Sequence, residues 1–367
     1  MSRMSVNEPD AGATDRRSPQ AEAPDWWIYR GTGRPIHDID LAQILPAPPP
    51  WRNFQGSPLP EPDVPPPDDG EADRRLGSEF HLADRGVDPH ELDMINAALY
   101  LRRPLLVTGK PGVGKSSSAY RIARELGLGR VLRWPITSRT ALASGLYGYD
   151  AIGRAQAAAT ARETRAASNN PDGPPLGDFI RLGALGTAFL PSRLPRVLLI
   201  DELDKSEADL PNDLLSIFED AEFTIPELAR IRHETRELNV HTDDPQRTAT
   251  VVEGRIRCRA FPVVVMTSNG EREFPPAFLR RCLRLEIQEP NVEQLAAMVA
   301  NHLLDPAGEH RVTLVQAFAE RSQAEGGLPA DRLLEAVYLA TSGAYRPDDV
   351  AWPRLLDALW QKLSTVP

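Results

Sequence analysis

Cysteine is almost absent from this sequence of 367 residues, and the two that occur, Cys258 and Cys282, stand in no metal-ligand pattern. Two cysteines without a spacing motif predict neither a disulfide framework nor a zinc site. The N-terminus also lacks the charged stretch followed by an apolar one that is typical of a secretory signal. We therefore expect a cytoplasmic protein.

Long hydrophobic runs are missing as well. No apolar stretch approaches the roughly 18–20 residues that a membrane-crossing helix needs. Runs such as Val197–Ile200 and Val263–Met266 are short and suit buried strands instead. No membrane partner is expected.

Lysine is scarce, and it occurs only at Lys110, Lys115, Lys205 and Lys362. The net charge is −10 and the pI is about 5.3. A general nucleic-acid binder usually carries a basic face, so nucleic acid is not expected as a partner. Two of the four lysines fall within the eight-residue loop 109–116, which sets that loop apart from the rest of the chain.

Residues 1–80 hold 14 of the 35 prolines together with many acidic residues. This composition offers little apolar surface for a core, so we expect a mostly disordered, Pro-rich arm. Two islands with tryptophan interrupt it, at 26–29 and at 48–54, which includes Trp51. Each island is either a docking motif, for a partner or for the chain's own body, or a local cluster without a partner.

Residues 81–290 alternate short apolar strands with helices, which predicts a parallel α/β sheet covered on both faces. The expected strands are 105–107, 130–134, 196–200, 261–267 and 283–287, and the expected helices are 91–101, 115–126, 209–220 and 275–281. We expect a surface insertion in the middle of 151–176 and a hairpin over 240–260. Residues 291–367 carry helix-spaced apolar residues and no strands, which predicts a separate all-α domain.

The most specific motif is the loop Gly109–Ser116, GKPGVGKS, which fits G-x-x-x-x-G-K-[ST] at every fixed position. It follows an expected strand and precedes an expected helix, as this motif requires. Its glycines let backbone N–H groups turn toward phosphate oxygens, and the following helix adds its positive end. We expect Lys115 to reach the β- and γ-phosphates of ATP and the Ser116 hydroxyl to ligate Mg²⁺.

Two acids, Asp201 and Glu202, end the apolar stretch 196–200. The carboxyl ends of parallel strands form the edge of the sheet where ligands bind. We expect Asp201 to hold Mg²⁺, directly or through water. Glu202 would orient and polarise the water that attacks the γ-phosphate.

A third strand ends at Asn269, and a short helix ends in Arg280 and Arg281. Asn269 is either a hydrogen-bond partner of the attacking water or the γ-phosphate, or simply a turn former. The arginines either stabilise charge on a transferring phosphoryl group, often one bound to a neighbouring subunit, or are cations favoured at a helix C-terminus.

The order of these motifs resembles the AAA+ ATPase superfamily over about residues 80–345, and most closely its MoxR-like branch. The stretches that carry the resemblance to that branch are 177–185 (GDFIRLGAL), 201–205 (DELDK), 214–219 (LLSIFE) and 223–226 (FTIP). The resemblance implies an AAA+ P-loop core in 81–290 and a helical lid in 291–367. It also places insertions in 141–185 and 240–260.

The resemblance further implies a role for each matching position. Asp201 and Glu202 would be the Walker B pair, Asn269 sensor 1, and Arg281 the arginine finger, with Arg280 as the fallback. Arg332 resembles sensor 2, although it is equally compatible with a surface residue of a helix. The expected nucleotide-binding residues are Gly109, Lys110, Pro111, Gly112, Val113, Gly114, Lys115, Ser116, Ser117, Asp201 and Arg332, with Ser116 and Asp201 also as metal ligands.

These expectations define a Mg²⁺-dependent ATPase that hydrolyses ATP to ADP and phosphate. It would remodel or activate an unidentified client protein as a homo-oligomer, with a hexameric ring as the expected form. The alternative is a switch or scaffold that turns ATP over slowly and recruits a partner through its N-terminal arm. The paired acids and the helical C-terminal domain disfavour a small-molecule kinase, and the acidic charge disfavours a nucleic-acid remodeller.

Overall fold

A five-stranded parallel sheet with the strand order β11-β1-β10-β5-β2 forms the centre of the fold. The computed structural model describes residues 24–36, 40–59, 65–77, 87–163, 174–302, 309–325, 327–342 and 352–360. The strands of the central sheet are β1 Leu105–Thr108, β2 Leu132–Pro135, β5 Val197–Asp201, β10 Val263–Ser268 and β11 Leu283–Glu286.

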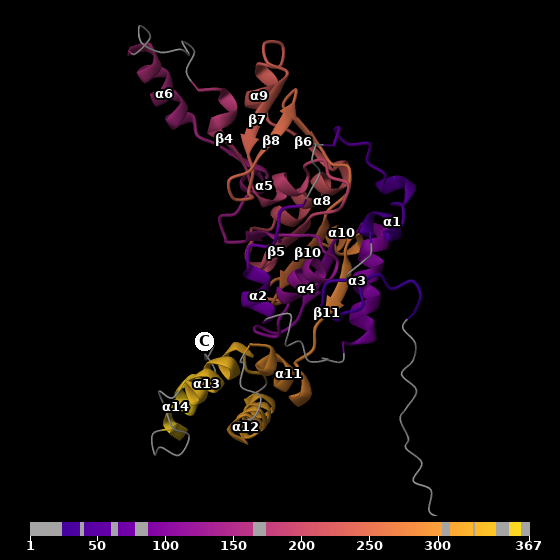
Figure 1. Cartoon of the computed structure of the whole chain (residues 1–367), viewed down its shortest axis with the longest axis vertical. Helices are drawn as coiled ribbons and strands as arrows, with labels where there is room; N and C mark the ends of the chain where they lie inside the picture. Colours follow the sequence, from indigo (N-terminus) through magenta and orange to yellow (C-terminus); the bar gives the residue numbers. More distant parts are fainter. Residues whose placement is uncertain are drawn as a thin grey trace, which may run out of the picture.

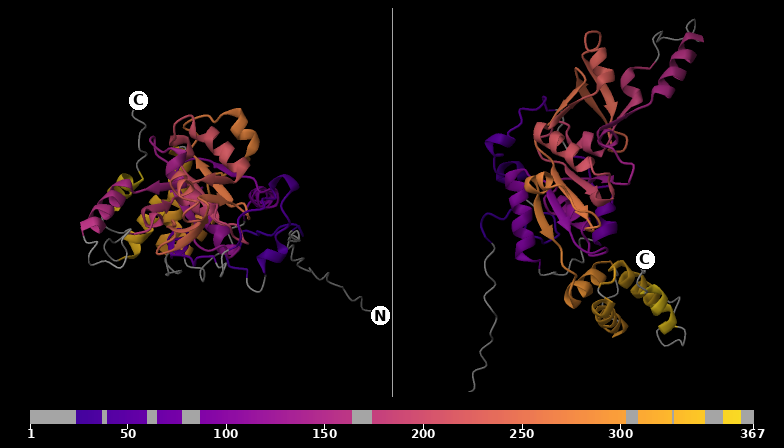
Figure 2. Two further views of the ribbon diagram at one scale, coloured as in Figure 1. Left: turned by 90° about the horizontal axis from the view of Figure 1, so that it is seen from above. Right: turned by 180° about the vertical axis from the view of Figure 1, so that it is seen from behind.

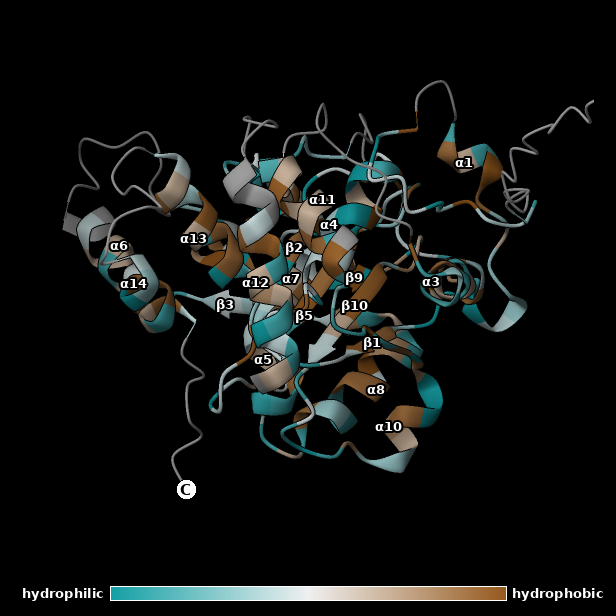
Figure 3. Ribbon diagram, turned by 90° about the horizontal axis from the view of Figure 1, so that it is seen from below, coloured by the Kyte–Doolittle hydropathy of each residue, from teal (hydrophilic) through white to brown (hydrophobic). Residues whose placement is uncertain are grey.

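Both faces of this sheet are buried under helices, because successive side chains of a strand point to opposite faces. On β1, Leu105 and Val107 join the core beneath α3 and α4, whereas Leu106 joins the core beneath α7, α8 and α10. Apolar colouring runs along β1 and β10 in Figure 3. The predicted doubly covered parallel sheet is therefore confirmed. The covering helices are α3 Pro89–Leu101, α4 Ser117–Glu125, α7 Ala184–Ala188, α8 Leu210–Asp220 and α10 Pro276–Arg281.

A second sheet is built from two insertions into the central fold, in the order β3-β4-β7-β8-β9-β6. Strand β4 of the first insertion pairs with β7 of the second, where Arg181 lies opposite His241. The expected hairpin is formed by β7 and β8 and begins at Glu237. The strands of the second sheet are β3 Tyr147–Tyr149, β4 Ile180–Leu182, β6 Glu222–Thr224, β7 Glu237–His241, β8 Thr248–Val252 and β9 Arg255–Arg257.

Short helices complete the insertions. Helix α6 extends away from the body in Figure 1, and the expected surface insertion continues into 164–173, outside the described residues. The short helices are α5 Leu142–Leu146, α6 Ala151–Glu163, η3 Leu176–Phe179, η4 Leu203–Lys205 and α9 Pro226–Arg230.

Helices follow the central sheet, as predicted, and the four that the structure describes there pack around a core of their own; we call this part the lid. Phe318 and Trp360 pack edge to face in this core, with ring centroids 5.5 Å apart. Figures 1 and 2 place the lid at one end of the molecule and α6, α9 and the β7–β8 hairpin at the other. The lid helices are α11 Val292–His302, α12 Glu309–Glu325, α13 Asp331–Thr341 and α14 Trp352–Leu359. No helix in the described ranges combines the length and the apolar character needed to cross a membrane.

The N-terminal arm, expected to be mostly disordered, packs against the body along its described stretches (Figure 1). Tyr29 is fully buried in the core beneath α3 and α4, so this island docks on the chain's own body. The arm needs no core of its own, because the body supplies the apolar surface. Its described stretches form three short elements, namely α1 Leu41–Ile44, η1 Pro50–Arg52 and α2 Glu71–Leu76.

The arm makes a second contact with the body through Arg52, next to an exposed tryptophan. Arg52 is buried, its Nη1 donates to the Phe218 carbonyl at 2.5 Å, and its guanidinium lies 5.3 Å from the Phe261 ring centroid. The neighbouring Trp51 remains 76% exposed. The second island therefore combines an anchor on the body with an exposed aromatic side chain.

A buried ion network ties the second sheet to the central one. Arg196, which precedes β5, donates from Nη1 and Nη2 to the Asp244 carboxylate at 2.8 and 2.9 Å. Arg130 donates to Asp244 at 3.4 Å and to Asp243 at 2.9 Å. Burial alone would raise the pKa of Asp244, but the bonds and charge of Arg196 outweigh it and hold that pKa below its usual range.

Replacing Asp244 with alanine is expected to destabilise the protein by about 3–5 kcal/mol, because it leaves the Arg196 guanidinium buried without its partner. Urea unfolding at neutral pH measures the loss. In the wild type, the contribution of Asp244 to the free energy of unfolding should be lost as pH falls through its lowered pKa. The reason is that the ion pair stabilises the folded state only while the carboxylate is ionised. Glu222→Ala, which breaks an exposed pair with Arg257 in the same sheet, should cost less than about 1 kcal/mol. Equal losses for the two variants would contradict this account.

Candidate active site

The phosphate loop connects β1 to α4 at the carboxyl edge of the central sheet. The Lys115 ammonium donates to the carbonyl oxygens of Gly109 and Lys110, each at 2.8 Å, and to Asn269 Oδ1 at 2.7 Å. Its side chain therefore points back over the loop and meets the end of β10. Residues separated by 154 positions in the sequence meet at this one ammonium group.

Burial lowers the pKa of Lys115, and the nearby carboxylates of Asp204, Asp201 and Glu202 oppose that shift. Lys115 is one of the few buried cations in the described part of the chain. The three hydrogen bonds of its ammonium group all go to neutral oxygens, so its charge is suited to an anionic ligand such as a phosphate.

Asp201 joins the phosphate loop to the ends of two strands. Its Oδ1 accepts from the Ser116 hydroxyl at 2.6 Å and from the Thr267 hydroxyl at 2.9 Å. Its Oδ2 accepts from Arg133 on β2 at 2.8 and 3.2 Å. Burial would raise the pKa of Asp201, but the hydrogen bonds from Ser116, Arg133 and Thr267 hold it below its usual range.

Glu202 adopts the left-handed backbone conformation with φ of 63°, which is uncommon for a residue with a side chain. Its N–H donates to the Thr267 hydroxyl at 2.8 Å, and this bond stabilises the turn. The carboxylate accepts from Lys205 at 2.8 Å and is about half exposed. Backbone strain of this kind is common where a protein aims a catalytic side chain.

Asp204 fixes the loop that carries Asn269. Its Oδ2 accepts from the backbone N–H of Asn269 at 2.9 Å and of Glu271 at 3.1 Å. Asp204 is 4% exposed, and its Oδ1 has no hydrogen-bond partner among the described residues. Asp204 therefore fixes the backbone that carries the Asn269 side chain.

The structure thus brings together two hydrogen-bonded pairs, Lys115 with Asn269 and Ser116 with Asp201, and Glu202 directly follows Asp201. Lys110 pairs with Glu289 at the start of the lid, and Pro111 lies exposed at the tip of the loop. Among the described residues no three His, Cys, Asp or Glu side chains are grouped as a metal site.

Arg280 and Arg281 lie at the opposite edge of the sheet. Arg281 Nε donates to Glu219 at 3.0 Å. Arg103 donates to the backbone carbonyls of both arginines. The next strand, β11, starts in register with the beginning of β1, as Leu283 lies opposite Leu105. The four residues of β1 separate this edge from the phosphate loop by about 13 Å.

Arg332 also lies outside the cluster. Its Nη1 donates to the Leu359 carbonyl at 2.8 Å, a bond between two lid helices. The side chain is partly buried within the lid.

Three residues of the site were missed from the sequence: Arg133, Thr267 and Asp204. Arg133 offered one signal, because it is a charged residue inside an otherwise apolar strand segment. Thr267 and Asp204 sit within two residues of predicted site residues. Their roles depend on pairing between strands that the sequence does not specify.

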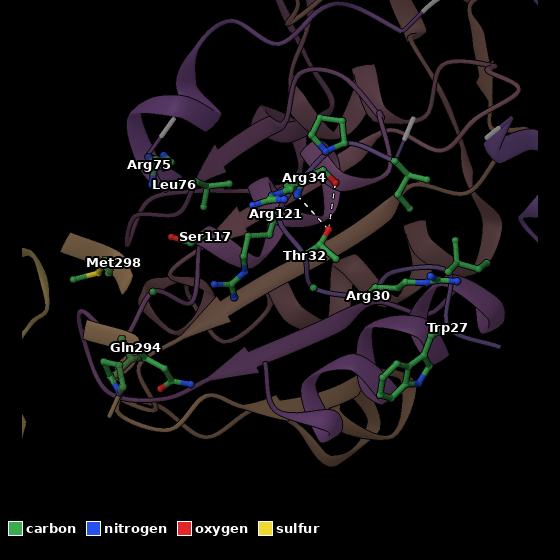
Figure 4. A pocket seen from close by; sticks show the side chains of 18 of the residues that line it. Trp27, Arg30, Thr32, Arg34, Arg75, Leu76, Ser117, Arg121, Gln294 and Met298 are labelled. Carbon is green, nitrogen blue, oxygen red and sulfur yellow. Dashed lines mark hydrogen bonds between the residues drawn. The ribbon is translucent and has the colours of Figure 1, made fainter. Parts of the chain in front are cut away.

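A cavity of about 770 Å³ adjoins the phosphate loop, a size typical of small-molecule sites. Its lining includes three parts of the chain whose side chains are labelled in Figure 4. They are the N-terminal segment with Trp27, Arg30, Thr32 and Arg34, helix α4 with Ser117 and Arg121, and lid helix α11 with Gln294 and Met298. A ligand held by the phosphate loop would have this cavity beside it.

Residues 104–282 match the family model of the AAA domain, dynein-related subfamily. The matched segment carries β1, β2, β5 and β10 of the central parallel sheet. The matched segment contains the phosphate loop, both acids, Asn269 and the two arginines of α10. It ends before the lid and begins after the N-terminal arm.

Solved structures with a similar fold include NtrX from Brucella abortus in complex with ADP, at 13% identity and a TM-score of 0.39. That likeness covers 80% of this chain and 59% of that one. A second structure of NtrX from Brucella abortus has 17% identity and a TM-score of 0.42, over 78% of this chain and 56% of that one. The chain thus spans less than two thirds of these relatives. No curated protein matches the sequence.

The lid touches the α/β body at the tip of the phosphate loop. Ala330 N–H donates to the Gly112 carbonyl at 3.4 Å. Gly112 has φ of 78°, and a Cβ there would lie 2.5 Å from Pro329 Cα. Only glycine therefore allows the loop and the lid to approach this closely.

Gly112→Ala is expected to loosen the lid as well as strain the loop. The matched control is Gly127→Ala, which has φ of 62° but open space around its Cβ. The control should cost only about 1 kcal/mol of backbone strain. Gly112→Ala should cost more and should speed tryptic cleavage within the lid severalfold. Thermal unfolding and limited proteolysis measure the two effects, and equal behaviour of the variants would show that the contact is unimportant.

Proposed function

We propose that this chain binds and hydrolyses Mg·ATP as a MoxR-like AAA+ ATPase. The observation that carries the proposal is the cluster around Lys115 and Asp201. The phosphate loop, the acidic end of β5 and the polar end of β10 meet there through bonds of 2.6–2.9 Å. Phosphoryl transfer needs this combination of a cation, a metal ligand and a group that orients water.

The oxygen donors fit a magnesium ion. Ser116 Oγ and the Asp201 carboxylate are hard ligands that share a hydrogen bond of 2.6 Å at the mouth of the loop. The ion would rely on these two residues, on water and on the oxygens of the nucleotide. Bound there, Mg²⁺ supplies charge neutralisation for the β- and γ-phosphates.

Each site residue then has a distinct task. Lys115 exchanges its bonds to the Gly109 and Lys110 carbonyls for phosphate oxygens. Glu202 leaves Lys205 and accepts a hydrogen bond from the attacking water, which orients it in line with the γ-phosphate. Asn269, held by Asp204, donates through its amide to the same water or to the γ-phosphate. The chain contributes positioning and charge stabilisation, with no covalent intermediate.

Arg281 is assigned to the active site of a neighbouring subunit. It lies at the edge of the sheet opposite the chain's own phosphate loop, about 13 Å away along β1. It cannot serve its own site without crossing the sheet. A ring, with a hexamer as the proposed form, presents this edge of one copy to the nucleotide site of the next. Arg280 remains the fallback, and a sensor 2 role for Arg332 requires exchange of its bond to Leu359.

The layout of the fold supports the proposed remodelling of a client protein. Hydrolysis would change the angle between the AAA domain and the lid, which meet at Gly112. The second sheet and α6 extend from the far end of the body and are proposed to contact the client (Figure 2).

The exposed Trp51 favours a second candidate, a slow switch that recruits a partner through its arm. The Walker B acids are also both neutralised, Asp201 by Arg133 and Glu202 by Lys205. In this alternative the nucleotide sets the state of the arm, and turnover is incidental.

Mixing two inactive variants tests the shared site. Lys115→Ala removes phosphate binding and Arg281→Ala removes the finger, so each alone should lose ATP hydrolysis by at least about 100-fold. A 1:1 mixture should recover up to about a quarter of wild-type activity, because a quarter of the interfaces pair an intact loop with an intact finger. Steady-state phosphate release at high protein concentration is the measurement.

Glu202→Gln is the matched control for binding, since it should lose hydrolysis while it still binds ATP. A mixture of Glu202→Gln with Lys115→Ala should stay inactive, because neither chain then supplies a complete loop and acid. Absence of recovery in the first mixture would refute the action of Arg281 in trans. Wild type that binds ATP but never turns it over would favour the switch.

A further inference from the structure

The N-terminal segment 27–33 forms one wall of the cavity beside the phosphate loop, yet it contains no helix or strand. Its backbone hydrogen bonds must therefore be satisfied by other parts of the chain. Side chains of α3 and α4 accept from five of its N–H groups, those of residues 28, 29, 30, 31 and 33. The wall is thus positioned by groups that belong to the AAA domain and its adjoining helix, and these groups are far away in the sequence.

Glu125 is the main holding group. Its Oε1 accepts from the N–H groups of Arg30 at 2.5 Å and Gly31 at 3.1 Å. Its Oε2 accepts from the Thr32 hydroxyl at 3.0 Å and the Gly33 N–H at 2.9 Å. Four donors occupy both oxygens of one carboxylate, the full capacity of that group.

The position of Glu125 is costly without these bonds. It is fully buried, and it is the last residue of α4, where the helix dipole disfavours a negative group. The four donors of the segment offset that cost. A neutral apolar residue would suit the core here, so the carboxylate is explained by the segment it holds.

Asn96 holds the preceding part of the segment. Its Oδ1 accepts from the N–H groups of Ile28 at 2.8 Å and Tyr29 at 2.9 Å, and its Nδ2 donates to the Tyr29 carbonyl at 2.7 Å. This fully buried amide acts as a substitute for a neighbouring strand. The segment is therefore fixed at two points before it reaches the cavity.

Helix α4 connects Glu125, which holds segment 30–33, to the phosphate loop. Its nine residues begin at Ser117, directly after the loop, and end at Glu125. The helix is rigid and about 13 Å long. Because Thr32 and Ser117 line the same cavity, the helix sets the distance between the wall and the loop (Figure 4).

We propose that Glu125 is a positioning residue for nucleotide binding, which holds segment 30–33 as the wall against the nucleoside part of the ligand. This inference rests on the proposed function of the site. It separates two kinds of affinity: the loop binds the phosphates, and the clamped wall adds contacts that only a nucleoside can use.

The test compares ligands with and without a nucleoside. Binding of ADP and of inorganic tripolyphosphate to the full chain, each with Mg²⁺, is measured by titration calorimetry. Glu125→Gln places an NH₂ group opposite two of the four donors, so ADP binding should weaken about tenfold. Tripolyphosphate binding should stay within about twofold of wild type. Thr32→Val, which removes one hydroxyl outside the core, should weaken ADP binding about threefold.

Glu222→Gln is the matched control, because it makes the same change in the second sheet and should leave both ligands unaffected. Thermal unfolding establishes that each variant is folded, and Thr32→Val carries the test if Glu125→Gln is not. Equal weakening of the binding of both ligands would overturn the inference, since the loop itself would then be damaged. Unchanged ADP binding would overturn it as well. If wild type binds tripolyphosphate but its affinity gains nothing from the nucleoside of ADP, only the role of the wall is refuted. Wild type that binds neither ligand would refute the proposed function as well.

Discussion

A hydrogen bond of 2.6 Å between Ser116 and Asp201 joins the phosphate loop to the strand that carries the acids. It can form only if β1 and β5 lie in the same parallel sheet with β10 between them, as the strand order places them. Lys115 completes the junction by reaching Asn269 at the end of β10. The helices packed on both faces of the sheet keep the ends of these three strands aligned. The alignment matters because a shift of one residue along any strand would separate the donors from the acceptors.

The two ends of the molecule are linked through this sheet. The cavity beside the phosphate loop and the lid lie at its carboxyl edge, whereas the second sheet and Arg281 lie at the other. The buried pair of Arg196 and Asp244 fastens the β7–β8 hairpin to the start of β5, so the hairpin and the acids sit at the two ends of one strand. Under the proposed function, a change of nucleotide at one end of β5 would act on the hairpin at the other end of this strand of five residues.

Proline-rich composition predicted little order in the arm, because it counts only the core that a segment can build for itself. Tyr29 is buried nonetheless, because Asn96 and Glu125 supply the hydrogen bonds that the segment lacks, and the core beneath α3 and α4 supplies the apolar surface. The same distinction explains Arg133. Nothing in a single strand indicates that its charge will meet Asp201 on the neighbouring strand, since that meeting depends on register.

Sequence alone determined the parallel α/β fold, the helical lid and the phosphate loop, as well as the candidate acids and Asn269. Local physical rules govern these features: apolar periodicity selects strands and helices, and the glycine spacing of the loop leaves its N–H groups free for an anion. Only the tertiary structure decided that the two insertions pair as one sheet, that Arg281 lies at the edge opposite the phosphate loop, and that Glu125 clamps the wall of the cavity. Those contacts join residues about 60 to 180 positions apart, and no local pattern records such pairings, because they depend on how the whole chain packs.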